Sequence, residues 1–181
     1  MANKDKITLG SGKLYCVEYT GEIPEDATIE TEENRLGYVS GGATLEYAPT
    51  YYEAKDDLGY VSKTILTQEE AKLKSGVMTF NGETLTRLCS TGRVTETDGK
   101  RTVLIGGAGN QDGKAYIIRF VHEDPVDGDV RVTIVGRNEA GFSLSYAKDK
   151  ETVIDAEFKA LAKLDTEGTL IKYEETIPTE G

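Results

Sequence analysis

Short runs of alternating apolar and polar residues dominate the chain. Residues 130–135 show the pattern clearly, because the aliphatic side chains at even positions fall on one face of an extended strand while Arg131 and Thr133 fall on the other. The same pattern predicts strands over residues 13–19, 43–52, 101–105, 115–121 and 141–146, and a final hairpin made of residues 153–162 and 168–173. The alternation therefore predicts a mainly β protein.

Turn dipeptides separate these runs. Asn, Asp and Gly tolerate the positive φ angles that a type I′ hairpin turn needs. Dipeptides of this kind are Asn81-Gly82, Asp98-Gly99, Asp112-Gly113 and Asp127-Gly128. The last three recur about 15 residues apart, which suits a meander of strands about six residues long. An antiparallel arrangement is therefore expected.

One short α-helix is predicted over about residues 82–90. Leu85, Leu88 and Cys89 share one stripe of such a helix, and Asn81 stands where it can cap the N-terminus. A helix this short needs packing against a sheet to be stable. The expected fold class is mainly β: two packed antiparallel β-sheets, as a β-sandwich or partial barrel, flanked by this one helix.

Residues 67–79 fit two structures. Residues 67–70 (TQEE) match a capping box before a helix, whereas the alternation of residues 71–79 favours a strand. Ser75-Gly76 argues against a long helix. We therefore expect a turn followed by a strand.

Length and charge set the domain organisation and limit the function. The 181 residues suit one domain with arms. We expect an N-terminal arm over 1–12, a single β domain over 13–173 and an acidic C-terminal tail over 174–181. The net charge of −11 repels phosphate and argues against a module that grips DNA. The acidic stretch 22–33 is expected to form a solvated loop.

Location and redox state follow from the same residues. The first residues, MANKDK, lack the apolar core of a signal peptide, so synthesis and assembly in the cytoplasm are expected. No run of about 18 apolar residues is present, so no membrane span is predicted. Cys16 and Cys89 are the only cysteines, and two small buried or half-buried thiols are expected, with a disulfide left to the geometry.

Candidate catalytic and ligand-binding motifs are few. His122 is the only histidine, which excludes a metal site with two histidines. The acidic stretch 122–129 lacks EF-hand spacing, so a solvated turn is expected ahead of a weak Ca²⁺ site. The glycine-rich residues 106–113 precede a strand-like run, which favours a hairpin tip over a phosphate loop. No catalytic residue, cofactor or metal site is predicted, and an enzyme is not expected.

Tyrosines gather in the first third of the chain: Tyr38, Tyr47, Tyr51, Tyr52 and Tyr60. Strand composition alone would explain them. Alternatively they belong to a long hairpin, at about residues 36–63, that contacts a partner, because tyrosine is enriched at protein interfaces. The tyrosines are therefore candidate contacts between subunits.

The order of several segments resembles that of the major tail proteins, or tail tube proteins, of long-tailed phages of Gram-positive bacteria. Residues 41–47 are similar to the strand that opens the long hairpin of this family, and residues 57–66 to its return. Residues 77–88 resemble its strand-to-helix junction. Its closing hairpin resembles residues 154–160 with 168–171. The segments cover most of the chain, and their order and spacing carry the resemblance.

The resemblance implies a structural subunit with no catalytic residues and no cofactor. It implies rings of six subunits that stack into a hollow tail tube of the virion, through which DNA passes without specific binding. Tape-measure, tail terminator and tail tip proteins would be further partners. An acidic wall would let DNA slide, and Glu46 and Glu157 are candidate lumen acids because both sit in predicted strands.

Other functions remain open at this point. The tube subunit of a contractile tail or of a bacteriocin-like particle would have the same architecture. A glycan-binding β-sandwich would need an aromatic platform on an exposed face. A hydrolase would need a pair of carboxylates in a deep pocket.

Overall fold

The computed structural model describes residues 8–177. It confirms a mainly β chain, with 46% strand and 8% helix, and the strands form two antiparallel sheets. In the large sheet the strands are β1 (Lys13–Glu18), β2 (Arg35–Gly37), β3 (Val39–Lys55), β4 (Ser62–Val77), β7 (Tyr116–His122), β8 (Val130–Asn138), β9 (Ile154–Ala160) and β10 (Lys172–Glu175). The small sheet pairs β5 (Arg93–Thr97) with β6 (Lys100–Leu104). Among the described residues, no helix is long and apolar enough to cross a membrane.

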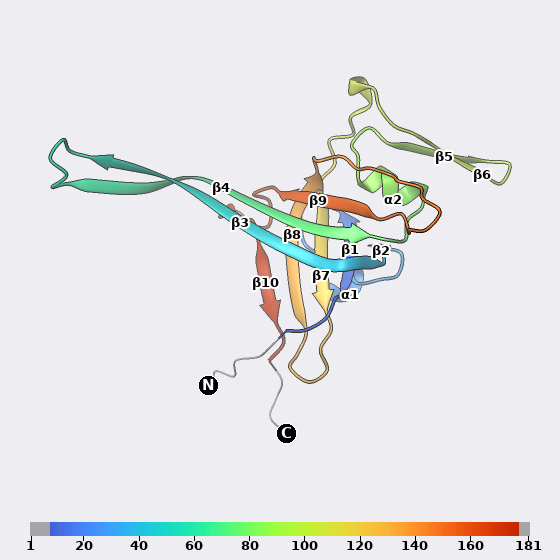
Figure 1. The fold of residues 1–181 in the computed structure, drawn as a ribbon, viewed down its shortest axis with the longest axis horizontal. Coiled ribbons are helices and arrows are strands. Elements are labelled where there is room, and N and C mark those ends of the chain that lie inside the picture. Colours follow the sequence, from blue (N-terminus) through green and yellow to red (C-terminus); the bar gives the residue numbers. More distant parts are fainter. Residues whose placement is uncertain (1–7, 178–181) are drawn as a thin grey trace.

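The large sheet has the order β2-β1-β7-β8-β9-β4-β3, and β10 also pairs with β8. One edge of β8 is shared between two neighbours: β10 pairs with its first half, and β9 pairs with it from Gly136 onward. The sheet therefore divides at β8. In Figure 1, β1, β7, β8 and β10 stand upright while β3, β4 and β9 cross them. The two layers expected of a sandwich thus belong to one bent sheet.

A hydrophobic core fills the angle between these layers. It includes Leu14 of β1 and Ile118 of β7 on one side, and Leu73 of β4 and Phe158 of β9 on the other, all almost fully buried. A second cluster, with Ile117 and Val135, covers the opposite face of the upright layer. Both faces of β7 and β8 are therefore buried, which fits their aliphatic sequences.

The predicted helix is present as α2 (Gly82–Arg87), and it is shorter than the expected 82–90. The Asn81 side chain accepts hydrogen bonds from the N–H groups of Glu83 and Thr84, so the predicted cap is confirmed. Asn81-Gly82 is therefore a helix start and not a hairpin turn. The helix ends early because the Leu88 N–H bonds to the Leu85 carbonyl, three residues back, in a tighter last turn.

A second helix, α1 (Asp26–Ile29), lies in the stretch 22–33 that was predicted to be a solvated loop. The prediction was wrong because part of this stretch faces the protein. Ile29 is fully buried, and Asp26 is ion-paired with Arg119 of β7. The buried isoleucine and the ion pair hold the four-residue helix on the sheet.

Several predicted strands differ from the structure. The hairpin expected at 36–63 is present as β3 and β4, but it is longer than expected. Its second strand continues to Val77 through residues 67–70, where a turn was predicted. The expected closing hairpin does not form, because β9 pairs with β8 and β4 while β10 pairs with β8. The segment 141–146, predicted to be a strand, forms none and pairs with no strand of the described chain. Alternation identifies which face is buried, but not the neighbouring strand.

Predicted turns and termini are partly corrected. Asp98-Gly99 forms the β5–β6 turn with positive φ at both residues, as predicted. Asp112-Gly113 and the glycine-rich residues 106–113 lie in a connection from β6 to β7 that includes a 3₁₀ turn at Ala108–Asn110, and not at a hairpin tip. Of the predicted arm 1–12, residues 1–7 lie outside the described residues. Of the predicted tail 174–181, Glu174 and Glu175 belong to β10, and residues 178–181 lie outside.

The two cysteines agree with expectation. Cys16 is buried in the core and Cys89 is half-buried, and both are free thiols. Burial raises the pKa of the Cys16 thiol to about 12. Cys16 therefore behaves as a small apolar side chain.

Candidate functional site

The most prominent feature of the surface is the outer part of the β3–β4 hairpin, which projects from the body (Figure 1). Pairing between β4 and β9 stops at Lys72, so beyond it β3 and β4 have only each other as neighbours among the described residues. Every residue from 44 to 69 is exposed. We name residues 47–69 the extension. A two-stranded ribbon without a core is only marginally stable in water, so this ribbon is unusual as a free element.

One face of the extension continues the core face of the sheet. Directly paired residues share a face, and Leu45 and Tyr47 pair with the buried Leu73 and Ala71. Continuing the alternation along β3 adds Tyr51, whose partner on β4 is Leu66. Tyr47 and Tyr51 are 50% and 60% exposed. An aromatic and aliphatic row therefore runs out of the core into solvent.

Tyr47 is fixed in its position on this row. Its hydroxyl donates to Glu69 Oε1 at 2.5 Å, and this hydrogen bond raises the pKa of Tyr47. The bond holds the ring against the ribbon. The row is therefore partly ordered before any partner arrives.

The tip of the extension is a closed turn. The Asp56 carboxylate accepts the Val61 N–H at 2.6 Å and the Leu58 N–H at 3.3 Å, and the Val61 bond lowers the pKa of Asp56. The turn leaves Leu58 and Tyr60 almost fully exposed, at 77% and 84%. An ordered turn thus carries large apolar side chains into solvent.

The predicted tyrosines divide into two groups. Tyr47, Tyr51, Tyr52 and Tyr60 lie on the extension. Tyr38 does not: it lies between β2 and β3, where the Arg35 guanidinium stacks over its ring at 4.8 Å. Sequence reasoning missed the exposed aliphatic side chains of the β3–β4 hairpin, above all Leu45, Ile65 and Leu66. Their alternation along the hairpin was the available signal.

The candidate lumen acids Glu46 and Glu157 share one face, and both are paired with lysines. Lys74 Nζ lies 3.0 Å from Glu46 and 3.4 Å from Glu157, and Lys72 Nζ lies 2.9 Å from Glu157. The hydrogen bond from Lys72 lowers the pKa of Glu157, and the bond to Glu46 raises the pKa of Lys74. This face of β3, β4 and β9 is therefore a ladder of mixed charges.

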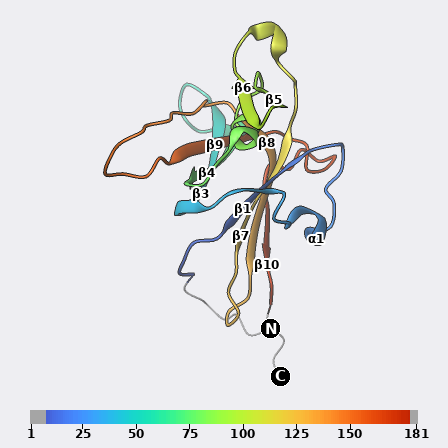
Figure 2. The same cartoon turned by 90° about the vertical axis from the view of Figure 1, so that its right-hand side faces the viewer.

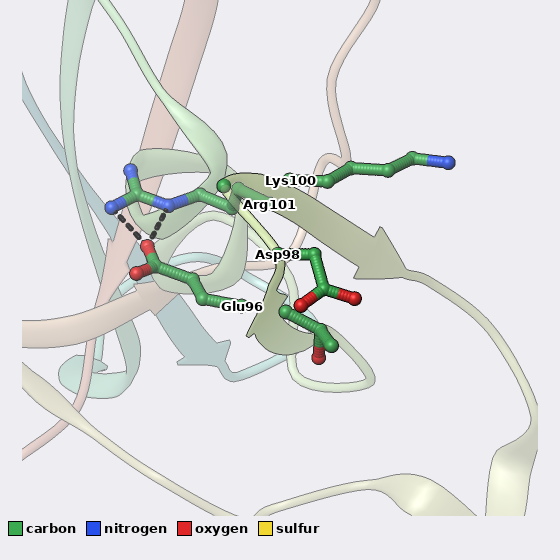
Figure 3. A pocket seen from close by; sticks show the side chains of 6 residues that line it. Glu96, Asp98, Lys100 and Arg101 are labelled. Atoms are coloured by element: carbon green, nitrogen blue, oxygen red, sulfur yellow. Dashed lines mark hydrogen bonds and ion pairs between the residues drawn. The ribbon is translucent and has the colours of Figure 1, made fainter.

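A hollow of about 380 Å³ surrounds the tip of the β5–β6 hairpin. In Figure 3, Glu96 is bonded to Arg101, while the Lys100 side chain points away from this pair. The hollow is the concave side of a turn, and its carboxylate and guanidinium neutralise each other.

The histidine region is a structured turn. His122 is buried and its Nδ1 lies 2.7 Å from the Ser11 carbonyl oxygen. The Asp124 carboxylate accepts the N–H groups of Val126 and Asp127, as in an Asx turn. Residues 8–177 contain no group of three or more His, Cys, Asp or Glu side chains that could hold a metal ion.

The extension is therefore the candidate functional site: an ordered ribbon with an exposed apolar row, an apolar tip and an unpaired β3 edge within the described chain. Such an arrangement can bind a protein surface or a further strand. No protein-family model matches this chain, and no curated protein matches it.

Proposed function

We propose that the protein is a structural subunit that assembles with copies of itself into stacked rings, as the tube of a phage-type tail. The exposed apolar row of the extension, which continues the core face of the sheet, is the observation that carries the proposal. Exposing such an apolar row to water is energetically unfavourable, and single soluble domains seldom expose one. A second copy would cover it.

Open strand edges support the same proposal. Within the described residues the 17-residue strand β3 pairs only with β4, so its other edge offers unpaired N–H and C=O groups. An isolated chain with such an edge tends to pair with other chains. In a closed ring each edge is used by a neighbour, which limits assembly to a defined particle.

The charge of the protein is compatible with a DNA conduit. A net charge of −11 disfavours binding to the phosphate backbone. The face with Glu46 and Glu157 would contribute a mixed-charge wall, because Lys72 and Lys74 compensate both acids. In this proposal the repulsion of DNA depends on the overall charge and not on these two residues alone.

The experiment removes the extension at a paired position. Tyr47 and Ala71 face each other, so residues 48–70 are replaced by Asn-Gly, a two-residue hairpin turn. Neither buried cluster contains a residue from 48–70, so the trimmed chain keeps its core. We expect rings or tubes of the full chain in negative-stain electron micrographs, and monomers of the trimmed chain with an unchanged melting transition.

A point variant tests the row itself. Tyr51→Ser with Leu66→Ser removes one exposed cross-strand pair, and Val126→Ser with Tyr173→Ser is the matched control at exposed sites outside the extension. Only the double variant Tyr51→Ser with Leu66→Ser should reduce assembly. A full chain that stays monomeric at high concentration, or a trimmed chain that forms normal tubes, would overturn the proposal.

A further inference from the structure

The segment 141–146 has the side-chain pattern of a strand. Phe142 and Leu144 are half-buried against the main core cluster, while Gly141, Ser143 and Ser145 between them are exposed. This is the alternation of an edge strand with one face on a core. The loop 139–153 that contains the segment stands out from the body in Figure 2.

The backbone of this segment lacks the matching hydrogen bonds. Its only bonds within residues 8–177 are to side chains: Asn138 Nδ2 donates to the Gly141 carbonyl, and Thr152 Oγ1 donates to the Ser145 carbonyl. The N–H and C=O groups of Phe142 and Leu144 form no hydrogen bond within residues 8–177. They are available to a strand that is added beside the segment.

An open groove lies beside the segment. Its volume is about 690 Å³, and its lining includes residues 140–143, the β3 bulge at Gly41-Gly42, and Asp155 of β9. Small side chains dominate the lining, so backbone is accessible. The groove thus offers an anchored strand edge and room for a second strand.

The same chain carries an unpaired strand that fits this edge. Residues 62–69 of β4 have β3 on one side and no described neighbour on the other. This stretch has no proline, whereas β3 contains Pro49, which lacks an N–H. Ile65 and Leu66 are exposed on successive positions, so in either register one of them would join Phe142 and Leu144 on the core side.

Charge also matches between the two surfaces. Lys63 of the extension and Asp155 of the groove form no ion pair or side-chain hydrogen bond within residues 8–177. By contrast, the other charged residues that line the groove, Lys74 and Glu157, are paired with each other. The groove therefore has one uncompensated acid, and the β4 edge has one uncompensated base.

From these observations we infer that segment 141–146 is the receptor strand for the β4 edge of the extension of a second copy, with Lys63 of one copy against Asp155 of the other. This inference rests on the proposed self-assembly and specifies which surface receives the extension. The contact is head-to-tail, because the donating and receiving surfaces differ. Pairing would occur by strand addition.

The test uses the trimmed chain as a receptor that cannot donate. It is mixed with the full chain, and binding is measured by light scattering and by hydrogen exchange. We expect the amides of residues 142–146 to exchange fast in the trimmed chain alone and slowly in the complex. Asp155→Lys in the trimmed chain should weaken binding about tenfold or more, because two like charges then meet. Asp149→Lys, an equal charge change in the loop before β9 and outside the groove lining, should not.

A charge exchange checks the pairing in the full chain. Lys63→Glu and Asp155→Lys should each reduce assembly, and the double variant should restore it. The inference is overturned if residues 142–146 exchange equally fast after binding, if the Asp155 and Asp149 variants behave alike, or if trimmed and full chains do not associate. In these cases tubes of the full chain would still support the proposed function, whereas a full chain that never assembles removes both.

Discussion

Arg119 lies in the middle of β7 with no exposed surface, and its charge is compensated from a different part of the chain. Its guanidinium bonds to Asp26 and lies 3.2 Å from Glu30, while its Nε donates to Thr133 at 3.0 Å. Arg131 on β8 makes a bidentate contact with Glu30 at 2.7 and 3.1 Å. Burying an arginine is tolerable only with such partners, so α1 serves as its counter-charge.

This arrangement predicts a pH dependence for the stability of the fold. The hydrogen bond from Arg119 lowers the pKa of Asp26 below its ordinary value of 3.8. A carboxylate with a lowered pKa stabilises the folded state above 3.8, and that contribution is lost as the pH falls through the folded-state pKa. Asp26→Asn should therefore destabilise the protein near neutral pH, and the difference from the natural chain should shrink below pH 3.8.

Urea unfolding of both proteins between neutral and acidic pH measures this difference. Glu167→Gln, at an exposed acid without an ion pair in the described chain, is the control and should show no such trend. A difference that is constant over the whole pH range would mean that the ionised Asp26–Arg119 contact does not stabilise the fold.

Among the elements, β8 decides the architecture, because it changes neighbours along its length. Its second half meets β9 at Gly136, where the two backbones come very close. A Cβ atom at Gly136 would lie 2.0 Å from the Lys159 carbonyl oxygen, so no side chain fits without movement of the backbone. Gly136 therefore permits the bend that brings β9, β4 and the extension to their positions.

Gly136→Ala is expected to destabilise the protein by about 1–3 kcal/mol, the usual cost of overpacking. The loss of stability would come from the contact of the new Cβ with the Lys159 backbone, since the φ angle of Gly136 is not positive. Gly109→Ala is the matched control, since a Cβ there meets nothing within 4 Å and its φ is not positive. Thermal unfolding compares the two variants, and equal melting temperatures would show that the corner tolerates a side chain.

At the scale of the whole molecule, the protein consists of a packed body and an extension with no core of its own. Strand β4 belongs to both parts: residues 72–77 lie between β3 and β9, while residues 62–69 have only β3. Local opening costs little where apolar contacts are few. One strand should therefore show two levels of stability.

We predict a gradient of hydrogen exchange along β4 in the unassembled protein. Amides of residues 62–69 should exchange many times faster than those of residues 72–77, and assembly should remove most of the difference because a neighbour then covers the extension. Mass spectrometry of peptides from the two halves measures it, with β7 as the protected reference. Uniform protection along β4 in the monomer would show that the ribbon is stable without a partner.

Much of the fold could be predicted from local pattern. Strands β1, β7 and β8, the Asp98-Gly99 turn and the Asn81 cap follow from alternation and turn chemistry, which depend on neighbours in sequence. The place of β10 on β8 could not be predicted, since strand pairing joins residues far apart in the chain. Helix α1 was missed because its counter-charges, Arg119 and Arg131, lie on other elements.

The candidate site could likewise be predicted only in part, because local pattern does not show which distant strands meet. The sequence determined a long, tyrosine-rich hairpin and a mainly β chain, because side-chain alternation encodes which faces are apolar. Only the tertiary structure decided that β9 stops at Lys72, that residues 47–69 are exposed on both faces, and that residues 141–146 have no strand beside them. Exposure and pairing depend on which distant strands meet, and that follows from the bend at β8.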